Sequence, residues 1–346
     1  MGNILARSPY IIEVDETGQD GSKVEVFLWN NGTTEPTTPQ YTLSKLIPAS
    51  NNTQTVYDIA PYIREYITFT QKQTPSTIEA LTTSQYCNVK VKRYKSVAGV
   101  YTLLNTLTYF GLDGYSYYEE GSNFDYGNYL LEQKTYYYQE GIYAGEFNAY
   151  MIISHNLKYT NLSTGASTTV TNASTVGWKT APRVHAAYAA VGNKLEVTDS
   201  EGTILATYYF KPICEPKYTP VIIDFINQYG AWQREFFFKA SKNTLAIESN
   251  DYNVMQSSVS SFDIYQGQKK SFNTNAKETI SVNSGYVNED FSSNIKQLIM
   301  SERILVDDKP AICKTKSLEV MKNINNHMIN YSLEFEFAYN TINNVI

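Results

Sequence analysis

The sequence predicts a mainly β, antiparallel fold, built as two or three β-sandwich-like domains with a few short helices. Three observations support this. Tyrosine is abundant, with 30 among 346 residues, and only 18% of residues are charged, which suits strands better than helices. Several segments alternate apolar and polar residues, and Gly, Asn, Asp and Pro separate them. We expect three parts, a β domain over 1–135, a Tyr- and Thr-rich β region with an exposed loop over 136–215, and a β-sandwich over 216–346.

The densest apolar and aromatic stretch, residues 217–241, predicts a central hairpin. Val221 to Ile226 is nearly all β-branched or aromatic and predicts a buried strand, and Gly230 suits the positive φ of a tight turn. Beyond the turn, aromatic residues share one side of a period-two pattern, with Gln233 and Glu235 on the other. The hairpin positions are Asn227, Gly230, Trp232, Phe236 and Phe238. A hairpin alone is marginal in water, so we expect the rest of the chain to cover it.

The N-terminal part predicts a first hairpin, in which 10–14 pairs with 24–29, followed by a short strand at 41–43. Residues 58–67 predict a short helix, because isoleucines recur every four residues behind a possible cap, Asp58. Residues 86–94 alternate and predict a strand with one buried face, formed by Cys87 and its alternate neighbours, and one wet face.

The other two parts predict further strands. In the middle we expect a strand at 150–154, an exposed polar hairpin or loop at 161–174, and a hairpin joining 194–198 to 203–210. The C-terminal part predicts a polar segment at 241–275 with a strand near 262–265, a strand at 279–282, a helix at 291–300 behind Asp290, and a hairpin joining 303–306 to 311–320. The alternation from Tyr331 to Tyr339 predicts a final strand with one buried face.

The aromatic region from Tyr101 to Tyr143 has two interpretations. It forms strands and loops of a tyrosine-rich sandwich, or it forms a contact between subunits, because tyrosine offers a large area with a polar tip at low entropic cost. The candidate interface residues are Tyr115, Tyr117, Tyr118, Tyr136, Tyr137 and Tyr138.

No enzymatic constellation is present, so we expect neither catalysis nor a metal or other cofactor. His155, His185 and His327 stand apart, without metal-ligand spacing, and the nucleophile and phosphate-binding motifs are missing. The carboxylate pairs occupy turns or a wet strand face; they are Glu119 with Glu120, Asp307 with Asp308, and Glu334 with Glu336. Three cysteines, Cys87, Cys214 and Cys313, suggest no disulfide framework.

The net charge of −6 disfavours a dedicated nucleic-acid binder, which needs clustered Lys and Arg. No secretion signal and no stretch of about 18 apolar residues is evident. We therefore expect no membrane insertion and folding in a cytoplasm.

Two segments resemble structural proteins from the tails and necks of tailed bacteriophages, most closely those of short-tailed, crAss-like phages of Bacteroidetes. One is the order Cys214, Pro220, apolar strand, Asn227, Gly230, Trp232, Phe236, Phe238. The other is the C-terminal succession of a short helix, a connection ending at Ser301, a hairpin and a closing aromatic strand. The resemblance covers about 210–346 well and 9–125 loosely, through 58–67 and the Tyr- and Gly-rich run ending at Asn123. Nothing in 126–200 is similar.

The resemblance implies a virion structural subunit, assembled in a host bacterial cytoplasm into a ring of the tail or neck around the DNA channel. It implies a homo-oligomer of sixfold or twelvefold symmetry, in contact with portal or adjacent tail and neck proteins, with DNA passing non-specifically. The alternative is a glycan-binding or receptor-binding adhesive module, in which exposed tyrosines such as Tyr117 and Tyr137 stack on sugar rings. The lack of repeats counts against an elongated tail fibre.

Overall fold

The computed structural model describes most of the chain as β-structure with two α-helices among the described residues, which confirms the predicted mainly β, antiparallel fold. The described residues are 2–30, 33–48, 54–68, 79–80, 86–125, 135–139, 146–151, 156–171, 177–182, 192–199, 201–213, 218–230, 232–255, 263–265, 267–318 and 328–343. The chain divides into two compact units. Unit 1 comprises 1–214 with 225–234, and unit 2 comprises 215–224 with 235–346. The tip of the central hairpin thus belongs to unit 1.

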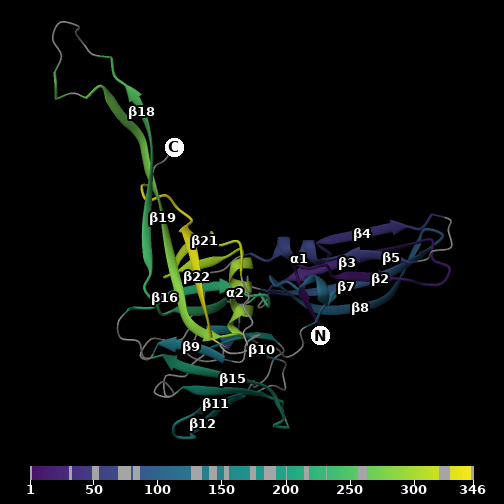
Figure 1. Ribbon diagram of the computed structural model, residues 1–346. Coiled ribbons are helices and arrows are strands. Elements are labelled where there is room, and N and C mark those ends of the chain that lie inside the picture. Colours follow the sequence, from purple (N-terminus) through teal and green to yellow (C-terminus); the bar gives the residue numbers. More distant parts are fainter. Residues whose placement is uncertain are drawn as a thin grey trace. The chain divides into compact units, whose positions relative to one another are not determined.

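Unit 1 begins with a five-stranded sheet of order β1-β8-β7-β3-β4 (Figure 1). Its strands are β1 (Gly2–Leu5), β3 (Gly21–Trp29), β4 (Tyr41–Leu46), β7 (Tyr86–Val97) and β8 (Val100–Leu112). All neighbours are antiparallel except β1 and β8. The predicted alternation of β7 is confirmed, since Cys87, Val89 and Val91 are buried while Lys90 and Lys92 face outward.

The buried face of this sheet packs on a two-stranded ladder and a helix. The ladder pairs β2 (Ile11–Val14) with β5 (Thr55–Asp58), and the helix is α1 (Ala60–Tyr66). The N-cap position of α1 is Ile59 and not the predicted Asp58, but Asp58 lies one residue before it and its Oδ1 accepts the N–H of Ala60 at 3.1 Å. Ile59 and Ile63 are fully buried in the core with the β3 and β7 valines, which explains their spacing.

The predicted pairing of 10–14 with 24–29 is wrong. Both strands exist, but β3 has β4 on one side and β7 on the other, so neither of its edges is open to β2. Ser22 of β3 instead binds β5 across the core. Its Oγ lies 2.6 Å from Thr55 Oγ1 and 2.5 Å from Tyr57 Oη. This buried hydroxyl cluster ties the ladder to the sheet.

The middle of unit 1 holds a second five-stranded sheet, of order β12-β11-β14-β15-β9. Its strands are β9 (Thr135–Gln139), β11 (Asn156–Asn161), β12 (Ser167–Thr171), β14 (Asn193–Thr198) and β15 (Ile204–Ile213). The predicted hairpin of 194–198 with 203–210 is confirmed, and Asp199 closes its turn by accepting the N–H groups of Glu201 and Thr203 at 2.9 and 2.8 Å. A three-stranded sheet, β10-β13-β6, comprises β6 (Glu79–Ala80), β10 (Glu146–Met151) and β13 (Gly177–Pro182).

The predicted polar hairpin at 161–174 is confirmed for its described part, 161–171. β11 and β12 pair antiparallel. In the turn between them Asn161 Oδ1 accepts the N–H groups of Ser163 and Thr164 at 2.8 and 3.2 Å. Residues 162–169 are exposed.

A seven-stranded sheet of order β17-β16-β20-β21-β22-β19-β18 dominates the C-terminal part of the chain. Its strands are β16 (Val221–Ile226), β17 (Trp232–Phe237), β18 (Lys242–Asn253), β19 (Lys269–Asn288), β20 (Ile304–Val306), β21 (Lys309–Cys313) and β22 (Met328–Phe337). The central hairpin is β16 and β17, as predicted. The predicted hairpin after the helix is β20 and β21, and its turn places Asp307 and Asp308 at positive φ of 47° and 64°. In β22 Tyr331, Leu333 and Phe335 are buried and Ser332 and Glu334 exposed, as predicted. The strand ends at Phe337, and Tyr339, which the pattern placed on the buried face, is 41% exposed.

Helix α2 (Phe291–Met300) has the bounds that the sequence predicts. Phe291, Ile295 and Leu298 are buried, so the apolar stripe is confirmed. Asp290 occupies the N-cap position, so the helix begins directly behind it as predicted, although the Asp290 side chain makes no capping hydrogen bond. Asn294, also buried, donates to Glu235 Oε1 of β17 at 3.0 Å. This bond joins helix and sheet within unit 2.

β18 and β19 extend beyond the rest of their sheet (Figure 1). β19 pairs with β22 only from Thr279 onward, and its residues 269–278 pair with β18 alone. We call residues 245–253 with 269–278 the arm. The sequence predicted a polar segment here with a strand near 262–265. The strands are far longer, and 264 and 265 lie in a turn, so the predicted strand is wrong at those residues.

Candidate interaction surfaces

The predicted interface tyrosines of β9 are mostly interior. Tyr136 and Tyr138 are buried at 1% and 2% exposure, while Tyr137 between them is half-buried. The ring of Tyr136 stacks on that of Phe210 with centroids 5.6 Å apart, because β9 and β15 pair in parallel and place the two side by side. Offset aromatic stacking of this kind stabilises a core. Tyr137 is therefore the member of this run with an accessible side chain.

Tyr115 is also buried, beneath the central hairpin. Its N–H donates to the carbonyl of Gln228 at 2.8 Å, and the guanidinium of Arg7 lies 5.2 Å from its ring centroid. Arg7 N–H in turn donates to the carbonyl of Gly114 at 2.9 Å. Residues 113–115 thus lie between the N-terminal segment and the 227–230 turn, all within unit 1.

Two glycines allow the close approach of the turn to residues 113–115. A Cβ on Gly114 would lie 2.5 Å from the carbonyl oxygen of Gln228, and a Cβ on Gly230 would lie 2.9 Å from the backbone of Asp113. Gly230 also has a φ of +72°, as predicted for the turn. Asn227 closes the turn: its carbonyl accepts Gly230 N–H at 3.0 Å, and its Oδ1 accepts Tyr229 N–H at 3.1 Å. The sequence indicated the turn, but not where it docks.

The rest of the predicted set lies at the surface. Tyr118 is fully exposed and Tyr117 half-buried. The pair begins a 3₁₀ turn, Tyr118–Glu120, fixed by a hydrogen bond from Tyr117 N–H to Glu120 Oε2 at 2.7 Å. The accessible tyrosine surface of the predicted set is therefore Tyr118 with parts of Tyr117 and Tyr137, and its role in an interface stays a prediction.

One end of the N-terminal sheet leaves apolar side chains uncovered. Leu46 at the end of β4 is 80% exposed, and Val97 and Val100, which flank the β7–β8 turn, are 48% and 67% exposed. Register places these strand ends side by side, because Gly21 of β3 pairs with both Leu46 and Ser96. Asp20 holds the turn by accepting hydrogen bonds from Ser96 Oγ and Ala98 N–H at 2.6 and 2.5 Å. The bond from Ser96 is the main reason that the pKa of Asp20 is lowered. We call Leu46, Val97 and Val100 the open end.

The outward face of the same sheet pairs lysines with aromatic rings. The ammonium groups of Lys90 and Lys92 lie 4.3 and 5.0 Å from the centroid of Phe27, which explains how a phenylalanine on a wet face is 1% exposed. Lys23 lies 4.3 Å from the Tyr94 centroid, and burial, together with the hydrogen bond to Glu25, raises the Tyr94 pKa to about 12. These cations are already engaged within the chain.

The arm also carries exposed apolar side chains. Every residue of β18 is exposed, including Leu245 at 53% and Ile247 at 66%. Near its far end Tyr252 and Phe272 meet edge to face, with centroids 5.5 Å apart, and remain 48% and 44% exposed. An isolated two-stranded hairpin is marginal in water. The arm therefore shows the features of a segment that a partner covers.

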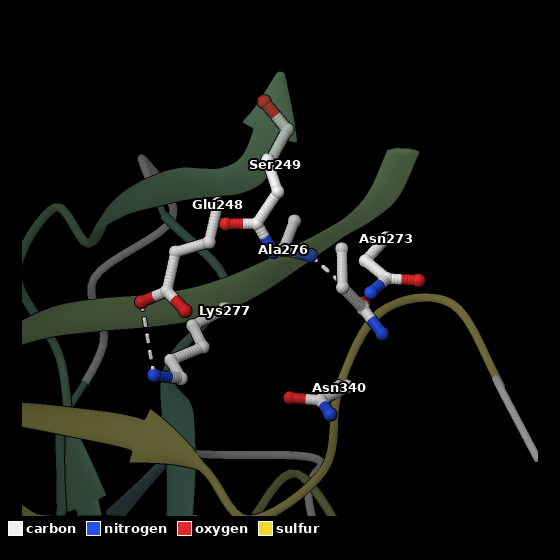
Figure 2. Close-up of a pocket in the computed structure, with 8 residues that line it drawn as sticks. Glu248, Ser249, Asn273, Ala276, Lys277 and Asn340 are labelled. Carbon is white, nitrogen blue, oxygen red and sulfur yellow. Dashed lines mark hydrogen bonds and ion pairs between the residues drawn. The ribbon is translucent and has the colours of Figure 1, made fainter. Parts of the chain in front are cut away.

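A polar hollow of about 350 Å³ lies where the arm leaves the sheet (Figure 2). It is lined by Glu248, Ser249, Asn250, Asn273, Asn275, Ala276, Lys277 and Asn340. Lys277 Nζ lies 3.0 Å from Glu248 Oε1, and the hydrogen bond and charge of this carboxylate raise the pKa of Lys277. The hollow offers one carboxylate already bound to one ammonium, together with amides. That set can hydrogen-bond a polar ligand.

Asn275 fastens the C-terminal segment to the base of the arm. Its Nδ2 donates to the carbonyl of Ile342 and its Oδ1 accepts Ile342 N–H, both at 3.0 Å. Thr341 N–H adds a bond to the carbonyl of Ala276 at 2.9 Å. β19 is thus bonded on both sides at this point, and the bare edge of the arm is β18.

The remaining groups of chemical interest form no cluster in the described ranges. His155, His185, His327 and Cys214 lie outside those ranges. Cys87 is fully buried, and desolvation raises its pKa to about 12. Among described residues no group of three or more His, Cys, Asp or Glu has the arrangement of a metal site. No described helix has the length and apolar character to cross a bilayer.

Comparisons with known proteins found no protein family, no curated protein and no solved structure that this chain matches.

Proposed function

We propose that this protein is a structural subunit of a phage virion, which forms a ring of the tail or neck around the DNA channel and joins portal-proximal to distal tail components. The observation that carries the proposal is that each unit leaves an apolar group uncovered at strand ends. These groups are the open end in unit 1 and the arm in unit 2. Exposed apolar groups of this kind mark surfaces that partners cover.

Two different exposed apolar surfaces, the open end and the arm, are compatible with a ring. In a closed ring each subunit presents one surface to the neighbour on one side and another surface to the neighbour on the other side. The open end and the arm differ in their residues. One can therefore contact the neighbour on one side, and the other can contact the neighbour on the other side. The resemblance of the central hairpin and the C-terminal segment to phage tail and neck proteins supplies the ring, its sixfold or twelvefold symmetry and its place in the virion.

The charge is compatible with a DNA channel. A net charge of −6 makes adhesion of phosphate unfavourable, and the outward lysines of the N-terminal sheet are occupied by Phe27, Tyr94, Glu25 and Glu35. DNA would therefore pass such a ring without binding tightly.

Electron microscopy of the purified protein tests the proposal. We expect class averages with a central hole and six or twelve copies, and native mass spectrometry of the same sample should give the matching mass. The variant Leu46→Lys/Val100→Lys should lose the ring while circular dichroism stays unchanged, because it charges the open end without touching the core. Tyr118→Ala tests the predicted tyrosine interface by the same two measurements. A chain that stays monomeric at high concentration and binds no portal or tail protein contradicts the proposal.

A second candidate function is a glycan-binding adhesive module, and the polar hollow favours it. Three amides at the hollow, those of Asn250, Asn273 and Asn340, make no side-chain hydrogen bond to other described residues, and the Tyr252–Phe272 pair lies next along the arm. Amides bind sugar hydroxyls and aromatic rings stack on sugar faces. Binding on a glycan array that Asn273→Ala and Tyr252→Ala abolish, and that Tyr137→Ala leaves intact, would support this function at the hollow.

A further inference from the structure

β18 is an edge strand that the described part of the chain leaves bare over its whole length. It pairs with β19 on one side, and all residues from Lys242 to Asn253 are exposed. Such an edge presents unpaired N–H and C=O groups to any strand of matching length, and proteins protect edges with proline, several lysines or short strands. β18 is long, has no proline and has one lysine. Its irregularity, a register shift between Glu248 and Asn250, lies toward the far end.

One face of β18 continues the buried face of its sheet. Leu245 lies opposite Glu278 and Ile247 opposite Ala276, on the face that also carries Ile280. Ala276 and Ile280 are buried, and Ile280 pairs with the buried Phe335 of β22. Leu245 and Ile247 therefore extend the apolar face of the sheet past the point where the chain itself covers it. A strand added beside β18 would bring its own side chains against both of them and lower their exposure.

We propose that β18 of two copies of this chain pair antiparallel with each other, about a two-fold axis at Leu245. The strand adds to its own counterpart and joins the two sheets into one. Leu245 then meets Leu245 of the second copy, and each Ile247 lies beside this pair, opposite Asn243. The four apolar side chains form one cluster on the face that already carries Ala276 and Ile280.

The backbone limits which registers are possible. In an antiparallel pair the residues whose N–H and C=O groups point outward must lie opposite residues of the same kind, and these groups alternate along a strand. Before the register shift at Glu248, a two-fold pairing therefore sets even positions against even and odd against odd. Pairing about Leu245 meets this condition along the whole run from Lys242 to Glu248.

Charge selects this register from its neighbours. Pairing about Leu245 sets Lys242 against Glu248 of the second copy, and the symmetry makes the ion pair twice, on the face opposite the leucines. Lys277 already lies 3.0 Å from Glu248, so the carboxylate would join two ammonium groups. Pairing about Ala246 sets Lys242 against Asn250 and Glu248 against Thr244, and pairing about Glu248 sets the two glutamates against each other. The register at Leu245 alone matches opposite charges.

This inference goes beyond the proposed ring. A two-fold contact joins copies that face in opposite directions, so it lies outside the contacts of a cyclic ring and would join two rings, or two free subunits. Both proposals use the arm, so if the β18 pairing fails, the ring rests on the open end and on the other exposed apolar residues of the arm, Tyr252 and Phe272.

Charge reversal in the full-length chain tests the pairing. We expect the wild type to form dimers in sedimentation velocity, and Lys242→Glu or Glu248→Lys to weaken the dimer about tenfold, because each creates two like-charge pairs. An equimolar mixture of the two variants should recover dimers, since every Glu then meets a Lys, and the double variant should recover them alone. Single variants that dimerise as well as the wild type, or a mixture that does not recover, overturn the charge pairing.

Disulfide trapping tests the register and works even if rings also form. Leu245→Cys should give a covalent dimer under mild oxidation, because the two sulfurs meet on the axis within disulfide range. Ala246→Cys is the matched control and should give no more dimer than the wild type. Trapping at 246 but not 245, trapping at neither, or a monomeric wild type overturns the proposal. Rings without trapping at 245 would leave the ring and remove this pairing, and trapped dimers without rings would do the reverse.

Discussion

The two edge strands of the seven-stranded sheet are opposites. β17, at one edge, is buried at every residue although it carries Gln233, Arg234 and Glu235. β18, at the other edge, is exposed at every residue although it carries Leu245 and Ile247. Residue polarity and burial are thus inverted between the two edges.

The difference in burial between β17 and β18 indicates different roles for the two edges. Buried polar groups are tolerated when they are hydrogen-bonded, as the carboxylate of Glu235 is by Asn294. β17 is therefore closed within the chain and contributes to its stability. Exposed apolar groups along a bare edge contribute little to the stability of a single copy, and we therefore infer that β18 serves association. Substitutions at β17 should change unfolding, and substitutions at β18 should change assembly.

The largest expected effect is at Phe236 of β17, which is 2% exposed and stacks on Phe238 with centroids 6.0 Å apart. We expect Phe236→Ala to lower the free energy of unfolding by about 3–5 kcal/mol, because it removes a buried ring and leaves a cavity. Denaturant unfolding followed by circular dichroism measures it. A loss below about 1 kcal/mol would mean that β17 is not part of the cooperative core.

Gly230, in the turn before β17, should come next. We expect Gly230→Ala to lower the free energy of unfolding by about 2–4 kcal/mol, because the new Cβ meets the Asp113 backbone and the residue keeps a positive φ. Gly202→Ala is the control, since Gly202 also has a positive φ, +88°, but a Cβ there meets nothing within 4 Å. Equal losses in the two variants would show that the clash of the new Cβ with residues 113–115 adds no loss of stability. The strain of a positive φ would then account for the whole effect.

Glu235 should have a smaller effect. We expect Glu235→Ala to cost about 1–3 kcal/mol, because it leaves the buried amide of Asn294 without this acceptor. Glu235→Gln, which keeps an acceptor oxygen, should cost less. A double-mutant cycle with Asn294→Ala measures the coupling by denaturant unfolding, and additive losses would mean that the bond between β17 and α2 carries no energy of its own.

The sequence predicts well those elements in which residue polarity and burial agree, unlike the two edge strands. Where the chain itself buries one face of an element, the apolar pattern predicts which residues are buried. β22 alternates as predicted from Tyr331 to Phe335. Helix α2 begins and ends at the predicted residues because Phe291, Ile295 and Leu298 form one stripe. β16 likewise has the predicted bounds, since its apolar run is buried on both faces. In these elements local composition and tertiary surroundings agree.

Pattern failed where the partner of a strand lies far along the chain. β2 was expected to pair with the next strand, yet it pairs with β5, because β4 and β7 occupy both edges of β3. The tyrosines of β9 had two interpretations, a tyrosine-rich sandwich or a subunit contact, and the stacking of Tyr136 on Phe210 of β15 agrees with the first. The arm was missed because Leu245 and Ile247 stand among Asn, Ser, Thr and Lys, and no local signal distinguishes such an exposed strand from a polar loop. Amino-acid composition does not show which segment or molecule packs against a strand.

The smallest effect on unfolding should come from β18, and it decides whether the comparison holds. We expect Ile247→Ala to change the free energy of unfolding by less than about 0.5 kcal/mol in dilute solution, because the side chain is 66% exposed in a single copy. The same variant should weaken self-association measured by sedimentation velocity, because in the assembly it removes a methyl-rich side chain from an apolar cluster. Thr244→Ala, on the other face of the strand, is the matched control and should change neither. A large loss of stability at Ile247 in a monomeric sample would mean that the chain covers this edge itself, and the contrast between the two edge strands would then disappear.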